Sequence, residues 1–223
     1  LLTGVYKPDE GIVKLDGQDI TGKKTIDINK AGIARTFQNI RLFSQMSVLD
    51  NVKVGLHNHH HYNTLEGILR LPRYRKVEKE MNERAMELLK VFDLEKDAEY
   101  LASNLPYGQQ RKLEIARALA TDPKLLLLDE HTAALDPGTA EKVLNLTKRI
   151  VEEHQLTCLM ITHNMQSALD LGNRILMMDS GDIVLDIHEE EKKGLTVEGL
   201  LEKFKTGAGK MLDNDRILLS GEK

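Results

Sequence analysis

Several features that many proteins carry are scarce in this chain of 223 residues. It has no tryptophan, 4% aromatic residues and one cysteine, Cys158. A single cysteine excludes a disulfide framework, so the chain fits a reducing compartment such as the cytoplasm. The few aromatic side chains leave little surface for stacking nucleic-acid bases. The net charge of −4 likewise gives no reason to expect nucleic acid as the main partner.

Long hydrophobic runs are also missing. No apolar stretch approaches the roughly 18 residues that a membrane-spanning helix needs, and we find no signal peptide. Apolar residues make up 41% and charged residues 30% of the chain, which is typical of a soluble globular protein. The chain starts at Leu1 without methionine, as if inside a structural element, and we expect its N-terminus to be incomplete.

The first half of the chain combines short strand patterns with a long helical stretch. Residues 11–20 alternate apolar and polar side chains around Asp16-Gly17, which predicts an antiparallel hairpin. Residues 32–38 predict a short strand that ends on the amide of Gln38. From about residue 48 to 105 the apolar residues recur with helical spacing, and we interpret this stretch as an inserted helical subdomain.

The second half alternates helices and apolar strands. The expected helices lie at 108–121, from Pro137 onward and at 165–171, and the expected strands lie at 125–128, 157–162 and 174–179. Leu125–Leu128 has no polar alternation, which indicates a strand buried on both faces. Asp136 is the expected N-cap of the helix that starts at Pro137. This alternation predicts an α/β fold with a parallel sheet.

Two adjacent acids, Asp129 and Glu130, end the apolar run Leu125–Leu128. Acids at the carboxyl end of a strand lie where α/β sheets bind ligands. A carboxylate in such a dry place is costly unless it meets a cation or a proton donor, and Mg²⁺ held by Asp129 through water meets that need. Glu130 would then face a water that attacks a phosphate. The alternative is that both acids cap the next turn, and the pair alone does not decide between the two.

Three further features favour a ligand site. The stretch LPYGQQRKLEIARALATDPKLLLLDE places Gly108-Gln109 at a helix start, about twenty residues before the two acids. Backbone N–H groups at a helix start bind phosphate oxygens. His163 follows the apolar strand in MITHN, and Gln38 ends the earlier strand. Each of these two residues alone is as well explained by an ordinary strand end.

Taken together and in this order, the residues resemble the motifs of ABC-transporter ATPase subunits. The Q-loop, signature, Walker B, D-loop and switch histidine correspond to Gln38, Tyr107-Gly108-Gln109, Asp129-Glu130, Asp136 and His163. The resemblance runs from Leu1 to about Ile187. Residues 32–55 and 105–123 are similar to the ATPases of branched-chain amino acid importers. The second half, where His131 replaces a proline common in the family, is similar to another branch of importer ATPases.

The resemblance implies an α/β fold with a P-loop NTPase (RecA-like) core, a parallel sheet, an N-terminal antiparallel β element and an inserted helical subdomain. The expected parts are the N-terminal part of the ATP-binding core at 1–47 and the helical subdomain at 48–107. A catalytic core with the signature helix, Walker B and switch histidine follows at 108–188, and a C-terminal tail at 189–223.

The resemblance also implies ATP and Mg²⁺ as cofactors of an ATPase. Asp129 would position the metal and Glu130 would be the general base that polarises the attacking water. His163 would contact the γ-phosphate. Gln38 would sense both the metal and the γ-phosphate, at the place where the helical subdomain pivots. Fixed donors and a metal together stabilise the charge that spreads over the γ-oxygens.

The implied partners follow from the same family. Tyr107, Gly108 and Gln109 would contact the nucleotide of an opposing subunit, with Asp136 at the same seam, so activity needs a homodimer or heterodimer. Other partners would be transmembrane permease subunits and, indirectly, a substrate-binding protein, with no nucleic acid. The expected location is the cytoplasmic face of the cell membrane, as a peripheral protein. The segment 41–43 could line a groove for a short permease helix, where exposed apolar residues are expected.

One motif of the family is not found. The P-loop would read Gly, four residues, then Gly-Lys-Ser/Thr. Residues 17–25 come within one residue of it, but Lys24 stands where serine or threonine belongs and no convincing helix opens there. We expect the P-loop to lie before Leu1 and the chain as given to be inactive. Pro106 also replaces the usual serine of the signature, which removes a hydroxyl and an N–H.

Alternatives to an importer ATPase remain open. One is a soluble ABC-type ATPase that acts outside transport, and the other is a non-catalytic interaction module without a P-loop. The histidine-rich stretch His57–His61 invites a metal site, but a solvated surface is the better interpretation because no carboxylate or cysteine pattern accompanies it.

Overall fold

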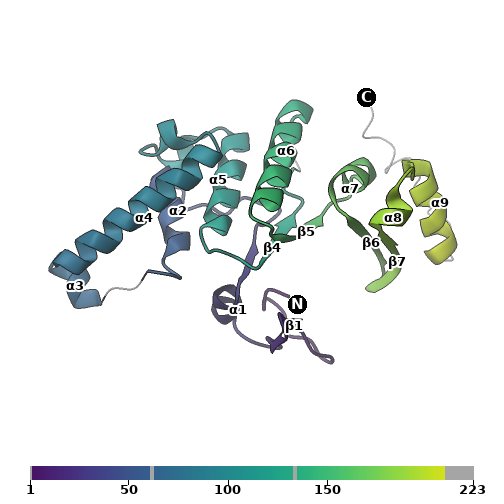
Figure 1. Ribbon diagram of the computed structural model, residues 1–223, viewed down its shortest axis with the longest axis horizontal. Helices are drawn as coiled ribbons and strands as arrows, with labels where there is room; N and C mark the ends of the chain where they lie inside the picture. The colour runs from purple at the N-terminus through teal and green to yellow at the C-terminus, as the bar shows by residue number, and fades with distance from the viewer. Residues whose placement is uncertain (1, 61–62, 133–134, 209–223) are drawn as a thin grey trace. The chain divides into compact units, whose positions relative to one another are not determined.

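The computed structural model describes residues 2–60, 63–132 and 135–208. These residues form two compact units that divide between Ile161 and Thr162, and each unit is described by itself (Figure 1). The predicted domain boundaries at 47/48, 107/108 and 188/189 stay predictions.

The first unit begins with a small antiparallel hairpin, as expected, although its strands are shorter than predicted. Strand β1 (Lys14–Leu15) pairs with β2 (Gln18–Asp19). Asp16 and Gly17 between them both have positive φ, 49° and 76°, which suits a two-residue turn between twisted strands. Helix α1 (Thr25–Ala31) follows.

A parallel sheet of three strands forms the centre of the first unit. Its order is β3 (Ile33–Arg35), β4 (Leu125–Asp129) and β5 (Thr157–Ile161). The middle residues of β4 are buried, which confirms the expectation from its unbroken apolar sequence. The register aligns Ala34 with Leu126 and Leu126 with Cys158, so the carboxyl ends of all three strands lie at one edge.

Strand β3 is shorter than the predicted strand over 32–38. Thr36 still donates its N–H to the Leu127 carbonyl at 2.9 Å, and the chain then leaves the sheet. Gln38 therefore lies on the loop after the strand, three residues past its end at Arg35. The prediction that Gln38 ends a strand is therefore wrong by three residues. The Gln38 carbonyl accepts a hydrogen bond from the Arg111 side chain, whereas the register of β3 with the sheet ends at Arg35.

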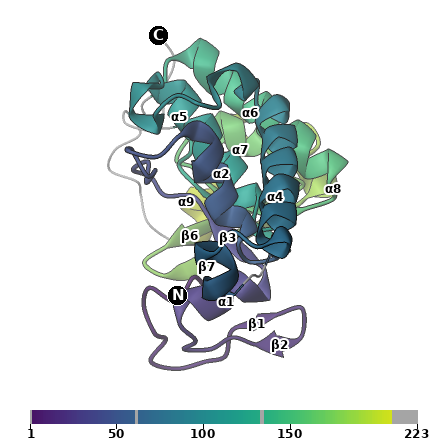
Figure 2. The same cartoon turned by 90° about the vertical axis from the view of Figure 1, so that its left-hand side faces the viewer.

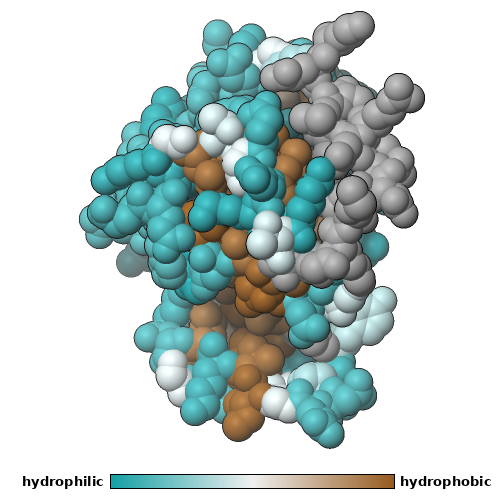
Figure 3. Space-filling view, turned by 90° about the vertical axis from the view of Figure 1, so that its right-hand side faces the viewer, coloured by the Kyte–Doolittle hydropathy of each residue, from teal (hydrophilic) through white to brown (hydrophobic). Residues whose placement is uncertain are grey.

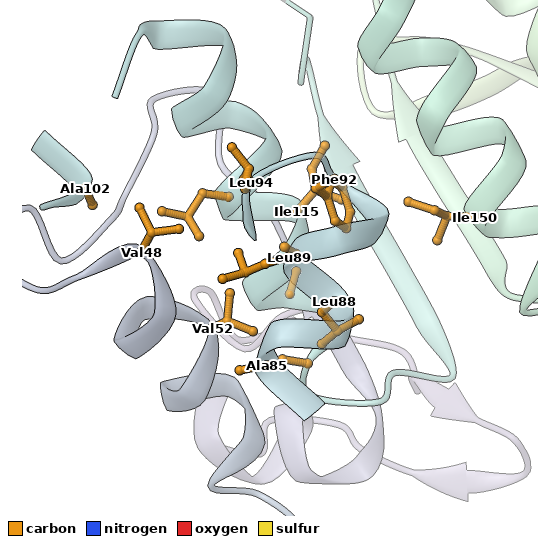
Figure 4. Close-up of a cluster of buried hydrophobic side chains, with 14 of the residues drawn as sticks. Val48, Val52, Ala85, Leu88, Leu89, Phe92, Leu94, Ala102, Ile115 and Ile150 are labelled. Carbon is orange, nitrogen blue, oxygen red and sulfur yellow. The ribbon is translucent and has the colours of Figure 1, made fainter. Parts of the chain in front are cut away.

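The stretch predicted as helical contains three α-helices and two short 3₁₀ turns. The helices are α2 (Val48–Leu56), α3 (Thr64–Ile68) and α4 (Pro72–Val91), and the turns are η1 (Glu95–Asp97) and η2 (Ala102–Asn104). Figures 1 and 2 show α2 beside both α4 and α5 (Tyr107–Leu119). Buried side chains from these helices meet in one cluster, shown in Figure 4, that includes Val52, Leu89 and Ile115.

Helix α6 (Pro137–Glu153) completes the first unit and begins as predicted. Asp136 caps it, since its carboxylate accepts a hydrogen bond from the Thr139 N–H at 3.0 Å. Val143, Thr147 and Ile150 are the buried residues of its inner stripe.

The second unit contains an antiparallel hairpin with helices around it. Its elements are α7 (Met165–Leu171), β6 (Arg174–Asp179), β7 (Asp182–His188), α8 (Glu189–Lys192) and α9 (Val197–Ala208). Sequence analysis placed β6 in the parallel sheet. Among the described residues it instead pairs with β7 in an antiparallel sheet, through the turn at Ser180-Gly181.

Some apolar side chains reach the surface, as the brown areas in Figure 3 show for one face of the molecule. In the second unit the exposed ones include Leu176, Met178 and Ile183 of the β6–β7 hairpin. Within the described ranges, no helix combines the length and the hydrophobicity that a bilayer crossing requires.

The helical cluster gives a direct test of the fold. Leu89 has 0% exposed surface, whereas its neighbour Lys90 is exposed. We expect Leu89→Ala to lower the free energy of unfolding by roughly 2–5 kcal/mol, through lost burial and a cavity. Lys90→Ala should change it by less than about 0.5 kcal/mol. Urea denaturation followed by circular dichroism measures both values, and equal effects would contradict the burial of Leu89.

Candidate functional site at the carboxyl edge of the sheet

The two adjacent acids lie at the carboxyl edge of the parallel sheet. Asp129 is the last residue of β4, and Glu130 follows with a φ of +43°. A positive φ is uncommon for a residue other than glycine. The Glu130 N–H donates to the Ile161 carbonyl at 3.0 Å, which ties this turn to the end of the neighbouring strand.

Gln38 and Glu130 meet at this edge. The Gln38 Nε2 donates a hydrogen bond to the Glu130 Oε2 at 2.9 Å, although the residues are 92 positions apart in the sequence. Two of the residues that sequence analysis selected from separate motifs therefore touch. This hydrogen bond holds the Glu130 carboxylate against the Gln38 amide.

Asp129 has a partner that sequence analysis missed. The Arg35 guanidinium contacts the Asp129 carboxylate at 2.6 Å, with 30% and 21% of the two side chains exposed. Arg35 is the last residue of β3, and it lies opposite Leu127 of the neighbouring strand β4. Arg35 ends β3 and Asp129 ends the neighbouring parallel strand β4. Opposite charges at the ends of two neighbouring strands are the signal that could have revealed this pair.

The residues at this edge fit a magnesium ion held mainly by phosphate and water. Asp129 and Glu130 supply hard carboxylate oxygens, and Mg²⁺ in nucleotide sites uses one or two such groups and keeps several waters. Across 2–60, 63–132 and 135–208, no three His, Cys, Asp or Glu side chains gather as a dedicated metal cage. His61 of the histidine-rich stretch lies outside these residues.

Arg111, which sequence analysis did not select, holds the loop that carries Gln38. Its side chain is 0% exposed and lies on α5. One nitrogen, Nη1, donates to the Phe37 carbonyl at 2.6 Å and to Glu114 at 2.7 Å. The other, Nη2, donates to the Gln38 carbonyl at 2.7 Å. The spacing of an arginine and a glutamate three residues apart on an apolar helix could have suggested a buried pair.

His131 lies directly after Glu130 and is 1% exposed. Burial first, and then the positive charge of Arg111, lower the pKa of the His131 imidazole to about 4. His131 is therefore neutral at physiological pH. The histidine that departs from the family pattern is thus an interior residue beside the candidate general base.

The signature residues lie in the first turn of α5. Helix α5 starts at Tyr107, one residue before the predicted start at Gly108, so Gly108 and Gln109 lie at the helix start as expected. A Cβ on Gly108 would come 2.6 Å from Thr139 Cγ2, so glycine permits the close approach of α5 to α6. The Thr139 N–H in turn binds Asp136, which brings these candidate dimer residues to one surface.

His163 belongs to the second unit, between the end of β5 and the start of α7. Its expected contact with the γ-phosphate stays a prediction.

Comparison with known proteins agrees with this geometry. Residues 1–133 match the family model described as ABC transporter. The chain is 38% identical over 185 residues to the high-affinity branched-chain amino acid transport ATP-binding protein BraF of Pseudomonas aeruginosa, covering 83% of this chain and 72% of that protein.

Solved structures show the same likeness. The ADP conformation of MJ1267, an ATP-binding cassette of an ABC transporter, superposes with a TM-score of 0.73 at 30% identity, over 92% of this chain and 80% of that one. The dimeric post-hydrolysis state of the cassette MJ0796, bound to ADP and Pi, superposes with a TM-score of 0.67 at 29% identity, over 84% and 77% of the two chains.

The fold and the matches define an α/β nucleotide-binding cassette with a P-loop NTPase type of core. Within that class, the chain belongs to the ABC transporter family, as an ATP-binding component.

The Arg35–Asp129 pair gives a prediction for the site. We expect a double-mutant cycle with Arg35→Ala and Asp129→Ala, measured by urea denaturation without Mg²⁺, to show a favourable coupling free energy of about 1 kcal/mol. The pair is only partly exposed, so water screens it incompletely. The exposed Lys124–Asp16 pair serves as the control and should show no measurable coupling. A zero value for Arg35–Asp129 would mean that the two charges do not interact in solution.

Proposed function

We propose that this chain is the ATP-hydrolysing subunit of an ABC importer for amino acids, of the branched-chain type. The observation that carries the proposal is the hydrogen bond between Gln38 and Glu130, beside Asp129, at the carboxyl edge of the sheet. The name of BraF supports the substrate class, because that relative is a branched-chain amino acid transport ATP-binding protein.

The site residues divide the work of hydrolysis. Glu130 accepts a proton from the attacking water, with its carboxylate oriented by the Gln38 amide. Asp129 would hold Mg²⁺, which would supply charge stabilisation at the phosphates. Asp129 is paired with Arg35 at 2.6 Å, so it would share its carboxylate between the guanidinium and the metal. For His163, which belongs to the second unit, the proposed contact with the γ-phosphate rests on the family resemblance alone.

Hydrolysis takes place between two subunits. The first turn of α5, with Tyr107, Gly108 and Gln109, reaches the nucleotide of the partner, and Asp136 lies at the same seam. The dimeric form of the related cassette MJ0796 supports this arrangement. Closure of the dimer on ATP and its reopening after hydrolysis drive a permease at the cytoplasmic face of the membrane.

A phosphate-binding loop completes the site. The pattern Gly-x₄-Gly-Lys-Ser/Thr does not occur in the 223 residues. In the described sheet, β5 pairs with β4 along one edge, and its other edge carries no described strand. Leu159 and Ile161 of β5 are 36% and 47% exposed. A strand that leads into a P-loop would fit beside β5 at this edge, and we expect phosphate release to require such a loop.

The catalytic proposal is tested on an extended protein, in which a strand and a P-loop precede Leu1. We expect Glu130→Gln to lower its kcat by about 100-fold or more, because a positioned general base contributes 10²–10⁴-fold. ATP binding should stay within a few-fold of the unchanged protein, since the amide keeps the volume of the carboxylate. Phosphate release measures kcat and a fluorescent ATP analogue measures binding.

The unextended chain serves as the background and should release no phosphate above buffer. Robust hydrolysis by that chain would contradict the need for a P-loop. Full activity of the Glu130→Gln variant would show that Glu130 is not the general base. The hydrogen bond from Gln38 would then have no role in orienting a base.

A permease helix docks at Phe43. The Phe43 ring is 48% exposed, and Arg117 of α5 lies 5.4 Å from its centroid. The backbone beneath the ring is fixed, since the buried Asn51 of α2 accepts from the Phe43 N–H and donates to its carbonyl, both at 3.0 Å. A rigid backbone with an exposed aromatic ring suits a contact with a partner protein.

We expect Phe43→Asp to reduce amino acid uptake about tenfold or more in vesicles that contain the complete transporter, because a charge replaces an apolar anchor. ATP hydrolysis by the separate ATPase subunit should stay unchanged. Ile12→Asp is the matched control, since Ile12 is 69% exposed at a distant hairpin. Normal uptake by the Phe43→Asp transporter would place the permease elsewhere.

A non-catalytic interaction module is the second candidate function. The absence of the P-loop pattern from the 223 residues favours it. An extended protein that binds the permease and fails to hydrolyse ATP would support this candidate over the first.

A further inference from the structure

The short helix α3 presents its apolar side to solvent. Leu65 and Ile68 of the helix and Leu69 at its C-cap have the i, i+3 and i+4 spacing that places side chains on one side. They are 62%, 73% and 62% exposed, and α3 has no buried residue. Leu71, just after the helix, is exposed too. An amphipathic helix normally turns such a stripe toward the core, so these side chains indicate a surface for a partner.

Polar contacts hold this apolar stripe in place. The Glu66 carboxylate accepts the Asn63 N–H at 2.7 Å in a capping box, and it lies 3.6 Å from the Arg73 guanidinium of α4. The Glu66 carbonyl accepts the Leu71 N–H at 3.0 Å, in the turn between the two helices. Figure 1 shows α3 at the start of α4. The stripe therefore belongs to an ordered corner, whose polar groups make the contacts with the protein.

Basic residues follow the apolar stripe into the first turns of α4. Residues 63–76 contain one acid, Glu66, and four basic residues, which are Arg70, Arg73, Arg75 and Lys76. All four basic side chains are exposed. From Glu78 onward acids alternate with lysines, so the excess of positive charge is confined to 63–76. The whole chain has a net charge of −4, and this local excess is therefore opposite in sign to the rest of the molecule.

We propose that residues 63–76, which we call the α3 corner, bind the surface of a membrane that contains anionic lipids. The apolar stripe lies at the boundary between headgroups and acyl chains, and the basic side chains meet lipid phosphates. Long arginine and lysine stems cover apolar surface while their charged heads reach the headgroups.

Charge complementarity selects this occupant. An anionic leaflet offers an apolar layer and negative charges together, which matches the corner better than a purely apolar or a purely acidic partner. The corner is far shorter than a bilayer crossing requires, so it stays at the surface. Lipid binding uses none of the residues proposed for hydrolysis, because the whole corner lies within 63–76.

The 223-residue chain is tested by co-sedimentation with vesicles. One set contains phosphatidylcholine alone, and the other contains phosphatidylcholine mixed with phosphatidylglycerol. We expect the partition coefficient to be about tenfold higher or more for the anionic vesicles, since each basic residue near an anionic surface strengthens binding severalfold. The acidic remainder of the chain would by itself give the opposite preference. High salt should weaken binding to the anionic vesicles, because it screens the charges.

The apolar contribution is tested with Leu65→Ser/Ile68→Ser. This variant should lower the partition coefficient for anionic vesicles about tenfold or more, since two aliphatic side chains no longer leave water. The matched control is Ile12→Ser/Ile26→Ser, because these two isoleucines are 69% and 60% exposed outside the corner. The control should bind as the wild type does.

The basic contribution is tested with Arg70→Gln/Arg75→Gln. We expect this variant to lower the partition coefficient for anionic vesicles about tenfold as well. Lys142→Gln/Lys148→Gln removes the same number of charges from exposed positions of α6 and is the matched control. It should leave the partition coefficient unchanged.

A fluorescent reporter locates the contact. The chain has no tryptophan, so Ile68→Trp introduces a single one in the apolar stripe. Its emission should move to shorter wavelength with anionic vesicles, because tryptophan enters the interface between headgroups and acyl chains. Ile12→Trp, at an exposed position outside the corner, should show no such change.

Each result supports or overturns the proposal. Equal binding to the two kinds of vesicle, a double variant that behaves like its control, or an unchanged emission of Ile68→Trp would each overturn it. Binding that appears only when permease subunits are present in the vesicles would assign the α3 corner to a protein partner instead. If the serine variant does not fold, the Ile68→Trp emission decides. Failure of the extended protein to hydrolyse ATP would contradict the proposed function and would leave the vesicle result unaffected.

Discussion

Arg111 and Glu114 bring two full charges into the protein interior, where removing one partner typically costs about 3–5 kcal/mol. That constraint holds the loop around Gln38, because the loop supplies two carbonyls to Arg111 and the Arg41 N–H to Glu114, although Arg111 Nε has no hydrogen-bond partner among the described residues. The position of the Gln38 amide against Glu130 therefore depends on α5 as well as on the sheet. Two elements therefore assemble the candidate site. Strand β4 leads into the two acids, and α5 holds the loop that carries Gln38 through Arg111 and Glu114.

Burial, and after it the charge of Arg111, keep His131 neutral, because both lower the pKa of the imidazole. A second positive charge beside Arg111 would be unfavourable, and burial already disfavours the protonated imidazole. A neutral ring next to Glu130 fills interior space and places no additional cation near the carboxylate. The charged side chains at this edge of the sheet are thus Arg35, Asp129 and Glu130.

Local patterns predicted much of the fold, and pairings between distant segments explain what they missed. The turn at Asp16-Gly17, the buried strand β4, the cap at Asp136 and the bounds of α7 are encoded within a few neighbouring residues. The contact of Arg35 with Asp129 and that of Arg111 with the loop that carries Gln38 join residues 94 and 73 positions apart. The strand-end positions of Arg35 and Asp129 indicate the first contact only once the two strands are known to be neighbours, and no periodicity or spacing indicates the second. The motifs that selected Gln38 and Glu130 worked because the family resemblance carries the long-range information.

The replacement of the usual signature serine by Pro106 changes which groups can meet a phosphate. Pro106 occupies the N-cap of α5, and the described residues supply no side-chain cap there. A capping hydroxyl would itself accept an N–H of the first turn. Without it, the N–H groups of 107–109 remain the donors that a helix start offers to an anion. Under the proposed function, the partner's phosphate would replace the missing cap. The departure at Pro106 then removes one hydroxyl and one N–H, and keeps the N–H groups of 107–109 on which anion binding at a helix start depends.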